Sequence, residues 1–149
     1  MSTYTETISE KLNDLLEKLN DAEKGYKKAA ENTNHPLLKP YFQKRSKERH
    51  DFGLTLKSEI EQFGEDAENS GSITGAIHRA WMDTKAFFST DDAEAMLEES
   101  IRGEKAAVSD YKEVLEDTSL PPTTAILLRK QLSQIIFDLN NIKTLEDLS

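Results

Sequence analysis

Two glutamates lie within helical stripes of apolar residues, where a carboxylate is unexpected. Glu104 lies three residues after Ile101 and four before Val108. Glu23 lies three residues before Tyr26 in a similar stripe. Residues three and four apart share one face of a helix, so both glutamates are predicted to face the core. A buried carboxylate is costly unless a cation, a hydrogen-bond donor or a metal satisfies it, and two in matching places indicate a designed feature.

The composition limits the classes of function. The chain has 149 residues, which suits one domain over 1–149, and it is 36% hydrophobic and 32% charged. Its net charge of −9 argues against nucleic acid and anionic membrane as partners. With no cysteine, disulfides, thiolate zinc sites and iron–sulfur clusters are excluded. The chain shows neither a secretory signal nor an apolar stretch of roughly 20 residues, which predicts a soluble cytoplasmic protein.

Apolar periodicity predicts an all-α chain. Long helices are expected over residues 5–32, 36–66, 91–117 and 121–145, and a shorter amphipathic helix over 73–88. Gly53 is expected to stay inside the second helix, because its neighbours are strongly periodic. The helices group into a hairpin over 5–66, a crossover over 67–90 and a second hairpin over 91–147.

An internal repeat supports this division. The segment from Tyr26 to Thr33 aligns without gaps on the segment from Tyr111 to Thr118, and the same offset pairs Phe52 with Phe137. Shared helical composition could mimic such a repeat, but two related hairpins explain it better. The sequence therefore predicts a ferritin-like up-down four-helix bundle, in which two helical hairpins are joined by a long crossover containing a short extra helix.

This topology brings polar residues from all four helices to one level. At a rise of about 1.5 Å per residue, Glu23 and Glu104 come to nearly the same height. Antiparallel pairing brings Arg45, Glu48 and Arg49 to that level from the second helix, and Gln131, Gln134 and Asp138 from the fourth. The members of the predicted structural polar layer are Glu23, Arg45, Arg49, Glu104 and Gln134.

At these residues the sequence resembles a bacterial family of uncharacterised ferritin-like four-helix-bundle proteins, a domain-of-unknown-function group. The resemblance covers nearly the whole chain, and three short runs carry it: Glu-Lys-Gly-Tyr at 23–26, Arg-x-x-Phe at 49–52, and Gly-Glu at 103–104 with Tyr111. It implies the fold much more than a function, because the family has no established activity.

The wider superfamily implies a dimetal site, which this chain matches only in part. That superfamily uses a Glu on helices 1 and 3 and Glu-x-x-His on helices 2 and 4. Glu23 and Glu104 match the single glutamates, and Glu48 is a candidate for the glutamate of helix 2. Asp51 stands where the histidine should be, and His50 is one position out of register. The fourth helix has no histidine, and it has no glutamate before Glu146.

Two interpretations of the layer stay open. In the favoured one, Glu23 and Glu104 pair with the guanidinium groups of Arg45 and Arg49, and the protein is non-enzymatic, with no catalytic residue and no cofactor. By superfamily analogy its role is stress-related, and it self-associates as a homo-oligomer through helix faces. In the alternative, the protein is an oxidoreductase or storage protein for iron, manganese or zinc. The ligands would come from Glu23, Glu48, His50, Glu104 and Asp138.

The remaining candidates favour structural roles. His35 precedes Pro36 and is expected at the surface or as a helix cap, and His78 is expected to face solvent. Trp81, with Phe87 and Phe88, is expected to hold the crossover helix against the bundle. The hydroxyls of Tyr26 and Tyr111, in matched repeat positions, are expected to hydrogen-bond a core carboxylate.

Overall fold

The computed structural model describes residues 4–62, 93–117 and 120–148, with side chains from residue 7 onward. Its helices are α1 (Tyr4–Asn32), α2 (Leu38–Glu61), α4 (Ala93–Leu115) and α5 (Pro122–Asn141), followed by the 3₁₀ helix η2 (Leu145–Leu148). The described ranges contain no strand. The prediction of an all-α helical bundle is confirmed.

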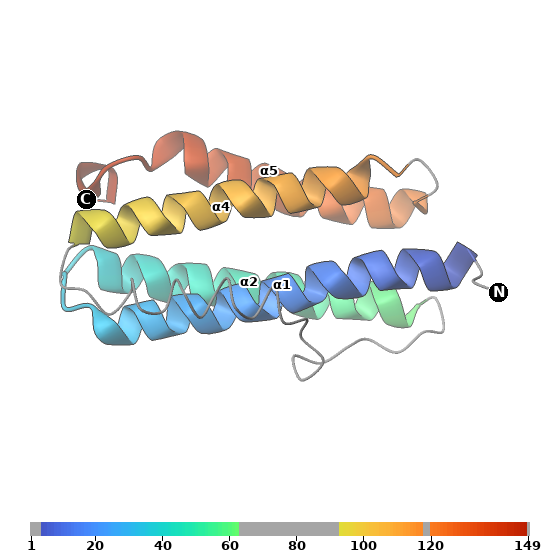
Figure 1. The fold of residues 1–149 in the computed structure, drawn as a ribbon, viewed down its shortest axis with the longest axis horizontal. Helices are drawn as coiled ribbons and strands as arrows, with labels where there is room; N and C mark the ends of the chain where they lie inside the picture. Colours follow the sequence, from blue (N-terminus) through green and yellow to red (C-terminus); the bar gives the residue numbers. More distant parts are fainter. Residues whose placement is uncertain (1–3, 63–92, 118–119, 149) are drawn as a thin grey trace.

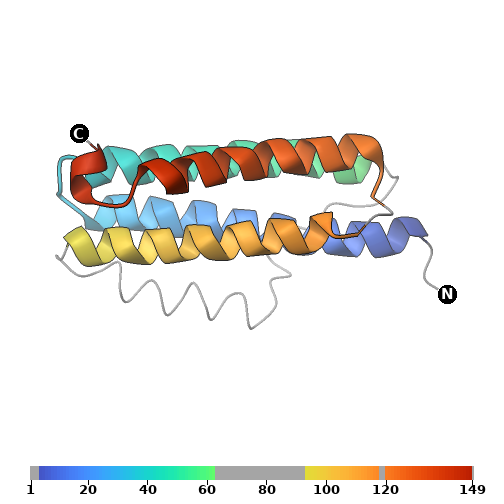
Figure 2. The same ribbon diagram turned by 90° about the horizontal axis from the view of Figure 1, so that it is seen from above.

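The four long helices lie side by side as two antiparallel hairpins (Figures 1 and 2). α1 pairs with α2, and α4 pairs with α5. α4 also lies beside α1, and α5 beside α2, so each helix has two antiparallel neighbours. Ion pairs join α1 to α4 and to the residues after it: Lys18 Nζ lies 3.1 Å from Asp110 Oδ1, and Lys11 Nζ lies 2.5 Å from Asp117 Oδ2, just past the end of α4.

The helix boundaries follow the predicted stripes with some differences at the ends. α2 continues through Gly53, as predicted, but ends at Glu61 rather than at residue 66. α5 ends at Asn141, four residues before the predicted 145, and η2 follows. The predicted helix over 73–88 lies outside the described residues, with His78, Trp81, Phe87 and Phe88. The boundaries of the two hairpins and the crossover stay a prediction.

His35 begins α2. Its Nδ1 accepts hydrogen bonds from the backbone N–H groups of Leu37 at 3.1 Å and Leu38 at 3.3 Å. The first N–H groups of a helix have no partner within the helix, so a side-chain acceptor there stabilises its start. His35 is therefore a capping residue, one of the two roles predicted for it.

Two apolar clusters form the core. The first contains Leu12, Leu16, Leu56, Tyr111 and Ile135 among others, and the second contains Tyr26, Leu38, Phe42, Met96 and Leu97 among others. Along α2 the second cluster ends at Phe42 and the first begins near Phe52. The buried residues of α2 between them are the charged Arg45 and Arg49, so a polar layer divides the core.

The repeated segments do not occupy equivalent environments. Phe52 packs against the first cluster, whereas its repeat partner Phe137 is 63% exposed. Leu54 is 53% exposed, whereas its partner Leu139 packs against the core. Among the described helices, none carries an apolar stretch long enough to cross a bilayer.

Candidate functional site: a buried arginine–carboxylate network

Two arginines on α2 enter the centre of the bundle because they continue its buried stripe. Arg45 and Arg49 are four residues apart and follow Tyr41 and Phe42 on the same face. Arg49 is 1% exposed and is the largest fully buried side chain among the described residues. Such burial of a guanidinium group requires close partners, since isolated charges are costly to desolvate.

Glu104 on α4 provides the partner of Arg49. Its Oε1 accepts hydrogen bonds from Arg49 Nη2 and from the hydroxyl of Tyr26 on α1. Ser100, one turn before Glu104, donates in turn to the Tyr26 oxygen at 3.2 Å. Glu104 is only 3% exposed. Through these two hydrogen bonds its carboxylate joins α1 and α2 of the first hairpin to α4 of the second.

Glu48 and Asp138 complete the network. Arg49 Nη1 donates to Glu48 Oε1 at 2.7 Å, and Arg45 Nη1 donates to both Glu48 oxygens at 3.1 Å. Arg45 Nη1 also donates to Asp138 Oδ2 on α5. The five charged residues Arg45, Glu48, Arg49, Glu104 and Asp138 are called the central network below. It links α2 to α4 and α5 through charge-assisted hydrogen bonds.

Aromatic rings flank both guanidinium groups. The Cζ atom of Arg45 lies 5.4 Å from the centroid of the Tyr41 ring, and that of Arg49 lies 5.7 Å from the Phe52 ring. These distances are within the range of cation–π attraction. The guanidinium group is planar, so it can stack on a ring and pair with a carboxylate at the same time. Arginine therefore suits this level of the bundle better than lysine does.

The central network contains three carboxylates and two guanidinium groups, and its environment shifts several pKa values. Burial raises the pKa of Glu48, and the guanidinium groups of Arg45 and Arg49 counter only part of that rise. Burial, the largest influence, would lower the pKa of Arg49, but the charges of Glu104, Tyr26 and Glu48 together outweigh it, and the pKa is raised. Both arginines therefore stay charged.

Tyr26 is held neutral by the same surroundings. Burial and then the charge of Glu104 raise the pKa of Tyr26 well above its ordinary value. Its hydroxyl therefore keeps its proton and donates a hydrogen bond to Glu104. Within the described part of the chain, Glu104 Oε2 and Arg45 Nε have no hydrogen-bond partner.

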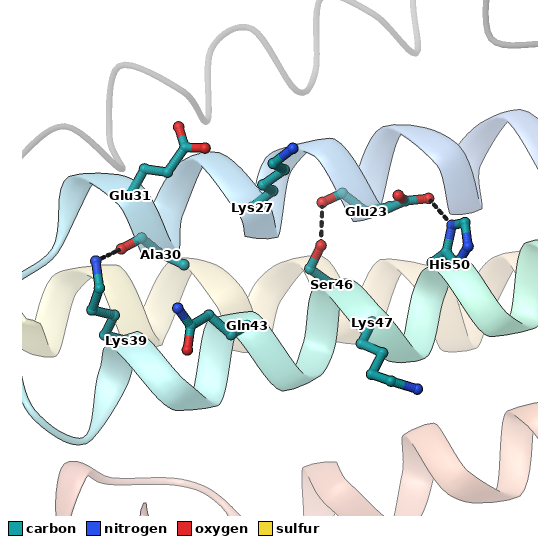
Figure 3. Close-up of a pocket in the computed structure, with 9 residues that line it drawn as sticks. All are labelled: Glu23, Lys27, Ala30, Glu31, Lys39, Gln43, Ser46, Lys47 and His50. Atoms are coloured by element: carbon teal, nitrogen blue, oxygen red, sulfur yellow. Dashed lines mark hydrogen bonds and ion pairs between the residues drawn. The ribbon is translucent and has the colours of Figure 1, made fainter.

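The structure does not bring all the predicted layer residues together. Arg45, Arg49 and Glu104 meet, but the Glu23 side chain is 31% exposed and pairs with His50, its Oε1 lying 3.2 Å from His50 Nδ1 (Figure 3). The expected pairing of Glu23 with the arginines therefore differs from the structure. Glu23 lies at the edge of the buried stripe of α1, on the side that meets the outer face of α2. Gln134 is exposed and reaches the network only through Asp138 Oδ1 at 3.3 Å.

Three polar contacts were not anticipated from the sequence. Ser100 joins the network through Tyr26, and its position one turn before Glu104 in the same stripe was the available signal. Tyr111 donates to Gln131 Oε1 at 2.5 Å, an amide rather than the expected carboxylate. Glu59 on α2 is buried and accepts from Thr124 Oγ1 at 2.6 Å and Thr123 Oγ1 at 3.1 Å, which ties α2 to the start of α5.

The residues present fit a metal centre poorly. The candidate ligands fall into two places, because Glu23 and His50 pair on the outer side of the first hairpin while Glu48, Glu104 and Asp138 bind arginines. Over residues 4–62, 93–117 and 120–148, no group of three or more histidine, aspartate or glutamate side chains is arranged to hold a metal ion. The two guanidinium groups at this level would also repel a cation.

Comparison with protein families matches residues 7–117 to the family described as a domain of unknown function (DUF2383). The matched region includes four of the five residues of the central network and ends before α5, which carries Asp138. No curated protein matches the chain significantly.

Proposed function

Because the chain belongs to a family of unknown function (DUF2383), we propose a function from the geometry of its centre: the protein is a non-enzymatic helical bundle that acts by binding. In this proposal it is a ferritin-like bundle of the bacterial cytoplasm. A stress-related role is added by superfamily analogy alone.

One observation carries the proposal. Arg49, which is almost fully buried, joins Glu104 and Glu48 at the level where a ferritin-like metal centre would require free carboxylates. General acid–base catalysis by Glu104 would likewise need its carboxyl group to exchange protons with a substrate. Glu104 is instead fixed by a permanent cation and a tyrosine hydroxyl.

Two of the surface hollows on the described helices, one between α1 and α2 and one between α1 and α4, lie apart from the centre. Neither is lined by a residue of the central network. A substrate in either hollow would therefore not reach Glu104 or Arg49.

The network would act by positioning the helices. It connects the first hairpin to both helices of the second. Buried ion pairs can set the register of packed helices even where they add little stability. The outer faces are then free to bind partners, including a second copy of the chain. Large apolar side chains are exposed on α2 and α5, namely Leu54, Ile126 and Phe137.

Metal analysis tests the proposal against the metal-binding alternative. Purified protein would be incubated separately with Fe(II) under air, Mn(II) and Zn(II), desalted, and analysed for metal, with oxygen consumption followed in the iron sample. We expect neither stoichiometric metal nor oxygen consumption above that of buffer.

A pair of matched variants makes the result specific. Glu23→Ala combined with Glu104→Ala removes the two glutamates of the alternative, and Glu94→Ala combined with Glu98→Ala removes two exposed ones from α4. Stoichiometric metal in the wild type that is lost in the first variant and kept in the second would overturn the proposal.

A further inference from the structure

Positive charge is concentrated at one end of an otherwise acidic chain. Residues 24–47 carry six lysines and one arginine but only one acidic residue, Glu31, although the whole chain has a net charge of −9. The lysines lie on the last part of α1 and the first part of α2, which meet at the turn. Lys39 is half-buried, and the other five lysines are exposed. This region is called the basic end below.

A groove runs between α1 and α2 within the basic end. Its volume is about 490 Å³, which falls in the range of small-molecule sites. Figure 3 shows α1 on one side of the groove, carrying Lys27, and α2 on the other, carrying Lys39 and Lys47. The groove lining carries three lysines against two glutamates, Glu23 and Glu31, so it keeps a net positive charge in an otherwise acidic chain.

Hydrogen bonds across the groove hold its walls in place. Ser46 Oγ donates to the backbone oxygen of Glu23 at 2.9 Å, and Lys39 Nζ donates to the backbone oxygen of Ala30 at 2.9 Å (Figure 3). These contacts join α1 to α2 at two levels. The groove is therefore formed before any ligand arrives, and ligand binding would not have to order the backbone.

The acidic side chains at the groove do not cancel its charge. Glu23 is engaged by His50 at 3.2 Å, and Glu31 is exposed to solvent. Lys27 is exposed, and Lys47 Nζ lies 3.1 Å from Asp51 Oδ2 on the outer face of α2. Exposed ion pairs of this kind are weak, so a multivalent anion can compete with Asp51 for the Lys47 ammonium group. Lysine binds phosphate and carboxylate oxygens as a mobile point charge, so no fixed fork geometry is needed.

We propose that this groove binds a small multivalent anion, carried by phosphate or by several carboxylates, through Lys27, Lys39 and Lys47. The site is separate from the central network and does not depend on the proposed non-enzymatic function. It gives the first hairpin a ligand-binding role that the buried arginines cannot perform.

Isothermal titration calorimetry at low ionic strength tests the site, with pyrophosphate as the phosphate probe and citrate as the carboxylate probe. The groove variant combines Lys27→Ala with Lys47→Ala. The matched control combines Lys28→Ala with Lys44→Ala, which removes the same charge from the same two helices of the basic end but from outside the groove. All four side chains are exposed, and thermal unfolding would show that both variants remain folded.

We expect one anion per chain, with the dissociation constant rising about tenfold in the groove variant and less than about twofold in the control. Tighter binding of pyrophosphate than of citrate would assign the site to phosphate, and the reverse to carboxylates. Equal weakening in both variants would show that only the diffuse charge of the basic end attracts anions, and would overturn the proposal. Failure of both anions to bind would do the same.

Discussion

Replacing Arg49 by methionine tests whether the buried ion pairs hold the bundle together. Methionine has a comparable length and fills part of the same space, so the change removes the charge more than the volume. Arg49 donates to Glu104 and Glu48, and hydrogen bonds to charged groups are worth about 1.5 to 3 kcal/mol each. Breaking a buried ion pair costs about 3 to 5 kcal/mol.

We expect Arg49→Met to reduce the free energy of unfolding by about 3 kcal/mol, the lower end of that range. The lower end applies because Glu104 keeps the Tyr26 hydroxyl and Glu48 keeps Arg45. Combining the change with Glu104→Gln should recover about 2 kcal/mol, because the carboxamide still accepts from Tyr26 and leaves no unpaired charge.

Urea unfolding followed by circular dichroism measures both variants, with Lys57→Ala as an exposed control on α2. A loss within about 0.5 kcal/mol of the control, or no recovery in the double variant, would refute the reasoning.

Three further predictions concern pH and association. The pKa values of three buried tyrosines are raised by burial above the unfolded value near 10, so their stabilisation is present below about pH 10 and is lost as the pH rises further. In a Tyr4→Phe variant these three are the only tyrosines. Its tyrosinate absorbance should increase only together with unfolding, and ionisation of all three in a folded protein would contradict this. The tyrosines are Tyr26, Tyr41 and Tyr111. The folded pKa of Glu48 is likewise raised, so the wild type should gain stability relative to Glu48→Gln as the pH falls through that pKa. Urea unfolding at several pH values measures this, and parallel plots of unfolding free energy against pH for the two proteins would count against it. Sedimentation velocity should show self-association that weakens when Ile126 and Phe137 are both changed to lysine, whereas a monomer at every concentration would contradict it.

The helices were predictable because their apolar stripes are regular, and the buried positions of α1 and α2 follow those stripes. The helix ends were less predictable. α2 ends at Glu61, although the sequence shows no break in its apolar pattern there. Arg45, Arg49 and Glu104 could be placed at one level from helix rise and antiparallel pairing alone. The partner of each could not be predicted, because periodicity does not say how neighbouring helices are rotated about their axes.

Glu23 shows the limit most clearly. Like Glu104, it lies within an apolar stripe at helical spacing, yet it lies at the edge of the stripe of α1 and meets His50 instead of an arginine. A small difference in the direction of the side chain around the helix axis is enough to place a residue in the groove between α1 and α2 instead of in the core. The repeat was similarly incomplete as a guide, because Phe52 packs inward while Phe137 faces outward.

The central claim is that arginines, and not metal ions, neutralise Glu104. The most direct measurement is a crystal structure of protein grown with Mn(II), with anomalous diffraction used to locate the metal. We predict that the Arg49 guanidinium lies within hydrogen-bonding distance of both Glu104 and Glu48, with no anomalous peak between them. An anomalous peak bound to Glu104, with Arg49 turned away, would contradict the account.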